Sequence, residues 1–115
     1  MSSPHQDRRK HQRVKIRVPI EFHQQGSRIL RSATADLSPG GCYLETLFTF
    51  PVGTILEVTL RVGCTVHAKA IVVSRELQVG NGIQFIDMAP TDRDAIRNYM
   101  ENAIKQTLSD NKHQE

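Results

Sequence analysis

The chain has 115 residues, of which 38% are hydrophobic and 23% are charged, a composition typical of one soluble domain and not of a disordered segment. No apolar run approaches the roughly 20 residues that span a bilayer, and the start lacks a secretory signal, so we expect no membrane insertion and a cytoplasmic location. The net charge is +3, but residues 5–17 alone carry +5, and this local field favours a localised anionic partner.

Residues 1–13 show no hydrophobic periodicity and are expected to form a flexible basic arm. The following residues, 14–90, contain six alternating or β-branched segments separated by turns rich in Gly and Pro, which predicts an antiparallel barrel or sandwich. Pro19 lacks an N–H, so we expect an edge or a bulge there. The expected strands cover residues 14–22, 28–37, 42–46, 54–62, 66–75 and 83–87, with a loop at residues 76–82.

The periodicity changes after residue 90. Thr91 is a suitable N-cap, and Asp94 is an acidic variant of the second capping-box residue. Apolar residues then recur every three or four positions, which predicts an amphipathic helix over residues 91–108 that covers the barrel, followed by a polar tail at 109–115. The recurring positions are Ile96, Tyr99, Met100, Ala103, Ile104 and Leu108.

The residue types that carry catalysis are scattered. The five histidines form no H-E-x-x-H or Cys/His cluster, and no G-x-S-x-G motif is present. "GNG" at residues 80–82 opens no helix, so it is not a dinucleotide fingerprint. Cys42 and Cys64 form no C-x-x-C pair, and we expect both to be free and buried. The sequence therefore predicts no enzyme, no cofactor and no metal site.

The arm contains two arginines at the spacing R-x-x-x-R, Arg9 and Arg13. A guanidinium can form two parallel hydrogen bonds to a phosphate or to the O6/N7 edge of guanine. On a helical turn the two arginines would share a face, and in an extended arm they would lie about 13 Å apart. Taken alone, this spacing is also explained by a solvated basic tail.

A second segment, "DLSPGGC", follows the second expected strand. Asp36 and Ser38 are two residues apart, so they point the same way if the strand continues through them. Asp36 could accept from the N1–H and N2–H₂ edge of guanine or orient an arginine. Pro39, Gly40 and Gly41 predict a tight turn whose backbone N–H groups an anion can approach. Alone, the segment could be a turn that merely ends a strand.

Together, R-x-x-x-R before the first strand and [D/N]-x-S-x-x-G after the second resemble the PilZ domain, a bacterial receptor family for the second messenger cyclic di-GMP. The resemblance covers residues 7–104 and includes "PVGT", "GNGIQFID" and "PTDRDAIRNYM". It implies an all-β fold with a C-terminal helix, namely a six-stranded antiparallel β-barrel followed by an amphipathic α-helix. This agrees with the periodicity of the sequence.

The resemblance also implies a set of ligand-binding residues. Arg9 and Arg13 would contact guanine and phosphate, Asp36 and Ser38 would contact a guanine edge, and the turn at Gly41 would leave room for the base. The full set is Arg8, Arg9, Arg13, Asp36, Ser38, Gly40 and Gly41. One residue among Val73, Ser74 and Arg75 is expected to flank the ligand, and the choice stays open.

The resemblance implies a cyclic di-GMP receptor or adaptor, in motility or biofilm formation, whose arm orders over the ligand. The ordered arm would relay the signal to an unidentified downstream protein. The receptor would act as a monomer or weak homodimer and bind one ligand or an intercalated pair. The alternative is a PilZ-fold adaptor in motility or pilus assembly that binds no ligand, against which the intact arginines argue. Binding to a nucleic acid polymer is disfavoured by the negative body and the 5% aromatic content.

Overall fold

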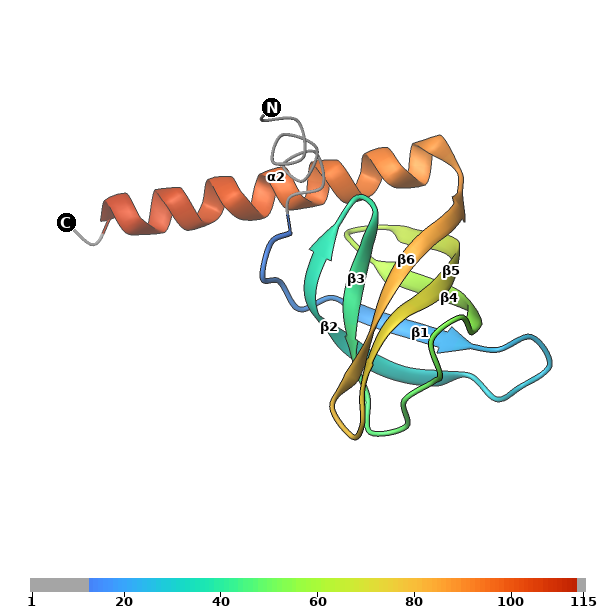
Figure 1. Cartoon of the computed structure of the whole chain (residues 1–115). Coiled ribbons are helices and arrows are strands. Elements are labelled where there is room, and N and C mark those ends of the chain that lie inside the picture. The colour runs from blue at the N-terminus through green and yellow to red at the C-terminus, as the bar shows by residue number, and fades with distance from the viewer. Residues whose placement is uncertain (1–12, 114–115) are drawn as a thin grey trace, which may run out of the picture.

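Figure 1 shows the computed structural model, which describes residues 13–113 and the side chains up to residue 106. The six strands close into a barrel in the order β1-β2-β3-β6-β5-β4, and every neighbouring pair is antiparallel. The expected six-stranded barrel followed by a helix is confirmed. The elements are β1 (Pro19–His23), β2 (Leu30–Ser38), β3 (Gly41–Glu45), β4 (Ile55–Arg61), β5 (Thr65–Glu76), β6 (Gly80–Met88) and α2 (Pro90–His113).

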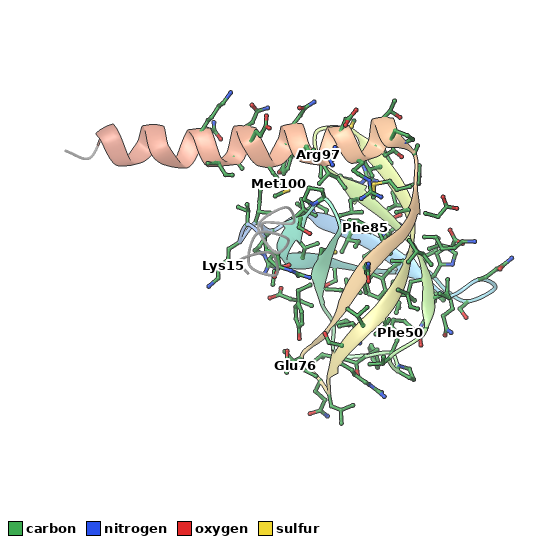
Figure 2. The ribbon with its side chains drawn as sticks, turned by 45° about the horizontal axis from the view of Figure 1, so that its top comes forward. Lys15, Phe50, Glu76, Phe85, Arg97 and Met100 are labelled. Atoms are coloured by element: carbon green, nitrogen blue, oxygen red, sulfur yellow. The ribbon has the colours of Figure 1, made fainter. Side chains whose placement is uncertain are left out.

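The barrel interior is filled by the inward side chains of every strand. In β4 the alternation is complete, because Leu56, Val58 and Leu60 are buried while the residues between them are partly exposed. The helix α2 packs on β2 and β5 and closes one end of the barrel with Ile96 and Met100, which belong to the same core. Figure 2 shows Met100 on the side of the helix that faces the barrel. The amphipathic face predicted for the helix therefore serves the core at these two positions.

The first strand is shorter than predicted, since β1 begins at Pro19. Val14 forms only an isolated bridge, in which its N–H and that of Leu37 each donate to the other's carbonyl at 2.9 Å. The hydroxyl of Thr34 accepts from the N–H of Val18 at 3.0 Å, where a ladder would have used a backbone carbonyl. A buried side chain thus replaces part of the ladder, while the alternation of burial that predicted the strand persists.

The last strand is longer than predicted. The sequence interpretation assigned the glycines before it to a loop, but Gly80 and Gly82 both lie in β6, and only three residues separate β5 from β6. A Cβ at Gly80 would lie 2.4 Å from the carbonyl oxygen of Leu44, and a Cβ at Gly82 would lie 2.4 Å from Oγ of Ser74. These glycines permit close packing within the sheet, which a turn-based interpretation missed.

The helix begins one residue earlier than predicted. The carbonyl of Ala89 accepts from the N–H groups of Asp92 and Arg93 at 3.0 and 3.1 Å. Ala89 is therefore the N-cap and Pro90 the first helical residue, a position that suits proline because the N–H it lacks would have no partner. The capping box centred on Thr91 was wrong, and the helix continues beyond residue 108 to His113.

The two cysteines differ. Both are free, as expected, and Cys42 is completely buried in the core. Cys64 is exposed, which contradicts the prediction that both would be buried. It lies in the connection between β4 and β5, after Gly63 with a φ of +86°, where the chain turns outside the barrel.

Candidate functional site

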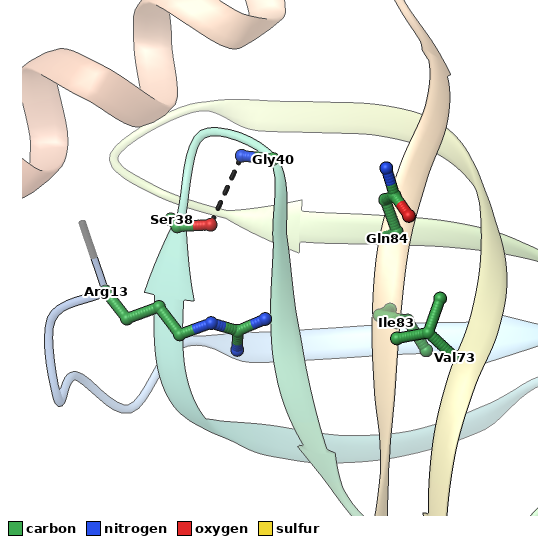
Figure 3. A pocket seen from close by; sticks show the side chains of 6 residues that line it. All are labelled: Arg13, Ser38, Gly40, Val73, Ile83 and Gln84. Atoms are coloured by element: carbon green, nitrogen blue, oxygen red, sulfur yellow. Dashed lines mark hydrogen bonds between the residues drawn. The ribbon is translucent and has the colours of Figure 1, made fainter. Parts of the chain in front are cut away.

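A pocket of about 190 Å³ lies on the barrel surface between the segment that precedes β1, the β2–β3 turn and the neighbouring strands β5 and β6 (Figure 3). It brings together the end of the predicted arm and the predicted turn, although 23 residues separate Arg13 from Asp36. Its lining residues are Arg13, Ser38, Gly40, Val73, Ile83 and Gln84.

Arg13 is held in place by an ion pair with Asp36. Its Nη1 lies 2.9 Å from Oδ1 of Asp36, and the N–H of Tyr43 donates to the same oxygen at 2.9 Å. Asp36 does not itself line the pocket, so its observed part is to orient the arginine. The other predicted ligand arginines, Arg8 and Arg9, lie outside the described residues.

Ser38 holds the β2–β3 turn together. Its Oγ accepts from the N–H groups of Gly40 and Gly41 at 3.2 and 3.1 Å, and its hydroxyl donates to the carbonyl of Gly41 at 3.2 Å. The side chain is almost completely buried, and its lone pairs and proton are already used. The carbonyl of Gly40 accepts from the N–H of Phe85 at 2.8 Å, which fixes the turn to β6.

Gly41 has a packing requirement in addition to the role that the resemblance implies for it. It is the first residue of β3, and a Cβ there would lie 2.2 Å from the carbonyl oxygen of Ile83 in β6. Such a contact is far inside van der Waals distance, so a side chain at this position would push the two strands apart. Gly40, by contrast, lies in the pocket lining itself.

The turn is also tied to the helix. Nη1 of Arg93, in the first turn of α2, donates to the carbonyl of Pro39 at 2.8 Å. These residues are 54 positions apart, and no local pattern in the sequence signals their contact. The pocket-side turn is therefore fixed to β6 through Gly40 and to α2 through Pro39.

The structure resolves which of the three candidates on β5 lies at the pocket. Val73 lines it, whereas Oγ of Ser74 accepts from the N–H of Gly82 at 3.1 Å and Arg75 donates to Thr49, away from the pocket. Gln84 also lines the pocket and was missed. Alternation in β6 carries the signal, because Gln84 is exposed between two buried residues of the strand.

The thiol of Cys42 is buried and keeps its proton. Burial, reinforced by the charge of Asp36 and opposed by Arg13, raises the pKa of Cys42 to about 12, so the thiol is neutral at ordinary pH. Partial burial and the hydrogen bond to Glu76 raise the pKa of Tyr43 to about 12. Among the side chains that the structure describes, those of residues 13–106, no group of three His, Cys, Asp or Glu is placed to hold a metal ion. None of the described helices is both long and apolar enough to cross a bilayer.

A comparison with known families assigns the chain to one of them. A family model described as the PilZ domain matches residues 7–102. The chain belongs to the PilZ domain family. A comparison of the PilZ chain with curated proteins finds no match.

Solved structures share the fold at low sequence identity. YcgR from Escherichia coli in complex with c-di-GMP superposes with a TM-score of 0.75 at 17% identity, over 94% of this chain and 51% of that one. The Bacillus subtilis inhibitor of motility, MotI/DgrA, gives 0.69 at 13% identity, over 84% and 51%. A Xanthomonas campestris protein, a tetrameric PilZ domain assembled through a helical bundle, gives 0.67 at 13% identity, over 94% and 99%. This PilZ domain thus spans about half the length of the first two proteins.

Proposed function

We propose that this PilZ domain is a receptor for cyclic di-GMP and has no enzymatic activity. The observation that carries the proposal is the pocket in which Arg13, oriented by Asp36, lies with the turn formed around Ser38 and Gly40. Both motif segments contribute to this one surface. Structures of YcgR from Escherichia coli that share the fold are complexes with c-di-GMP.

The chemistry of the pocket suits this ligand. One nitrogen of Arg13 is used by Asp36, and the remaining guanidinium donors can bond a phosphate or the O6/N7 edge of guanine. Val73 offers an apolar surface on which part of a base can rest. Because Asp36 fixes the arginine before a ligand arrives, less side-chain entropy is lost on binding.

The pocket is too small to enclose the whole ligand. Its volume of about 190 Å³ is below the roughly 300–1,000 Å³ of typical ligand pockets, so a cyclic dinucleotide needs further contacts. We assign these to Arg8 and Arg9 in residues 1–13, which would order over the ligand. The ordered arm would present a new surface to a downstream protein in the cytoplasm.

A second candidate function is a PilZ-fold adaptor that acts through protein contacts without the ligand. The observation in its favour is a group of large apolar side chains, more than half exposed, on two loops at the other end of the barrel. They are Leu47, Phe48, Leu77 and Val79. Such a surface would also serve the receptor, so ligand binding decides between the two functions.

Titration calorimetry of the full chain with cyclic di-GMP tests the proposal. The wild-type chain is expected to bind at micromolar concentration or below, and Arg13→Ala is expected to weaken binding at least tenfold. Arg28→Ala is the matched control, because Arg28 is an exposed arginine in the loop between β1 and β2. Absence of binding by the wild-type chain would favour the adaptor. An equal loss in both variants would indicate non-specific attraction, not a site.

A further inference from the structure

The pocket has an uneven supply of hydrogen-bonding groups. Of its six lining residues, only Arg13, Ser38 and Gln84 have polar side chains. The hydroxyl of Ser38 already forms its hydrogen bonds within the turn, and the side chain of Arg13 carries donors only. The residue Gln84 is exposed, and no hydrogen bond joins its amide to another residue of the described chain. Gln84 is therefore the one lining side chain with both a free donor and a free acceptor.

The strand register leaves this amide open on one side. Gln84 pairs with Gly41 on β3 and with Ile71 on β5. Since Gly41 has no side chain, the paired position in β3 places nothing over Gln84, whereas the paired position in β5 carries Ile71. Figure 3 shows Gln84 and Arg13 on either side of β3, with Gly40 in the turn just before the strand begins. The same glycine that lets the strands approach thus keeps the glutamine accessible.

A carboxamide matches one edge of guanine. The O6 atom of guanine accepts and its N1–H donates, so a glutamine can bond both through Nε2–H and Oε1. Arg13 can satisfy O6 or N7 but has no acceptor for N1–H. The carboxylate of Asp36, which pairs with Arg13, already accepts from Arg13 and Tyr43 through one oxygen and does not line the pocket.

We propose that Gln84 is a specificity-determining residue of the pocket that binds the O6/N1–H edge of a guanine. This inference rests on the proposed function, because it requires a guanine ligand. Gln84 supplies the acceptor that the two sequence motifs do not place in the pocket. Arg13 then serves the phosphate or the N7 side of the base.

Calorimetry of the full chain with cyclic di-GMP tests this role. Gln84→Leu keeps the approximate size and removes both hydrogen bonds, and we expect binding to weaken roughly ten- to a hundredfold. Gln84→Glu removes the donor to O6 and is also expected to bind more weakly. Gln25→Leu, at an exposed turn between β1 and β2, is the control and should bind like the wild-type chain. Gln84 is on the surface, so these variants are expected to fold.

The outcomes separate this inference from the function on which it rests. Binding by Gln84→Leu within twofold of the wild-type chain, with Arg13→Ala weakened, would overturn the role of Gln84 alone. Tighter binding by Gln84→Glu would also overturn it, since a carboxylate prefers the N1–H and N2–H₂ donors and not O6. Absence of binding by the wild-type chain would overturn both proposals.

A second ligand tests which edge is bound. Cyclic di-IMP keeps O6 and N1–H but lacks the exocyclic amine of guanine. We expect Gln84→Leu to weaken both ligands by the same factor. If Gln84→Leu weakened the binding of cyclic di-GMP alone, or if the wild-type chain did not bind cyclic di-IMP, the exocyclic amine would be the group recognised. Either result would overturn the proposal that Gln84 binds the O6/N1–H edge.

Discussion

The two ends of the β3–β6 pair present opposite surfaces on the same scaffold. At one end Gly41 pairs with Gln84 beside the pocket that Arg13 also lines, and at the other Glu45 pairs with Gly80 beneath two loops that expose large apolar side chains. Figure 1 shows these ends on opposite sides of the barrel, with α2 crossing the pocket side. Both ends have a glycine at which a Cβ would collide with the backbone of the neighbouring strand. The strand pair is thus built alike at both ends, and the adjoining loops make the difference.

Each end also has one buried polar side chain that organises its loops. At the pocket end this is Ser38, which bonds the turn that follows it. At the other end Oδ1 of Asn81 accepts from the N–H of Phe50 at 2.8 Å, and its Nδ2 donates to the carbonyls of Phe50 and Ser74 at 2.9 and 3.1 Å. At both ends, a few buried hydrogen bonds fix the shape of the loops, and the side chains on those loops decide the character of the surface.

The largest expected effect tests whether both glycines matter equally. Gly41→Ala and Gly80→Ala each place a Cβ within 2.4 Å of a backbone oxygen, so we expect each to lower the free energy of unfolding by about 3 kcal/mol. Gly26→Ala is the control, because Gly26 has a φ of +84° and nothing within 4 Å of its Cβ position. There only the backbone strain of about 1 kcal/mol remains. Urea denaturation measures all three, and equal losses at Gly26 and Gly41 would contradict the packing argument.

The next effect compares the two organising side chains. Asn81→Ala leaves three backbone groups without their buried partner, and we expect the free energy of unfolding to fall by about 3 kcal/mol. Ser38→Ala removes hydrogen bonds within one turn and is expected to cost about 1–2 kcal/mol. Urea denaturation of both variants sharpens the comparison. If Ser38→Ala lowered the free energy of unfolding more than Asn81→Ala does, the pocket end would contribute more to stability than its hydrogen bonds indicate.

A pH effect is expected from the pocket end. Burial raises the pKa of Cys42 from its ordinary value of 9.0 to about 12 in the folded chain. The unfolded chain therefore loses this proton at a lower pH than the folded chain does. The contribution of Cys42 to the free energy of unfolding is thus fully present below pH 9 and is lost as the pH rises from 9 to 12. We expect a contribution of roughly 1 kcal/mol per pH unit in this range.

Urea denaturation between pH 8 and pH 11 measures this contribution as the difference between the wild-type chain and Cys42→Ala. The difference isolates the thiol from other groups that titrate in the same range. Parallel pH profiles for the two proteins would show that Cys42 ionises as freely in the folded chain as in the unfolded one.

The smallest effect is expected from the apolar end itself. Phe48 is 74% exposed and Leu47 is 72% exposed, so Phe48→Ser and Leu47→Ser should each change the free energy of unfolding by less than about 0.5 kcal/mol. Thermal unfolding of the two variants checks this. A loss above 1 kcal/mol would show that these side chains pack in solution and are not a free surface.

The periodicity of the sequence predicted an antiparallel barrel or sandwich followed by a helix, and the resemblance to the PilZ domain selected the barrel, but neither predicted the details of the strands. Period-two burial predicted β4 almost to its ends, and the helical spacing predicted the buried Ile96 and Met100. The predicted strand ends were wrong where a side chain replaced a backbone hydrogen bond, and where glycines lay within a strand and not in a turn. Thr34 took over part of a ladder, and the glycines of β6 permit close approach and do not form a turn.

The candidate site was predictable only in its motif residues. Arg13 and the turn at Ser38 followed from two short patterns, and the structure brings them together. Gln84 was missed because an exposed polar residue in a strand is ordinary until the pocket beside it is known. Arg93 was missed because its contact with Pro39 joins positions 54 residues apart.

The hydrogen bond from Arg93 to the Pro39 carbonyl connects the first turn of α2 to the pocket-side turn. The helix has 24 residues, and at 1.5 Å per residue its length is about 36 Å. A tilt of about 5° at its first turn would move its far end by about 3 Å. A tilt that begins at this turn would thus displace the helix most where it extends beyond the barrel in Figure 1.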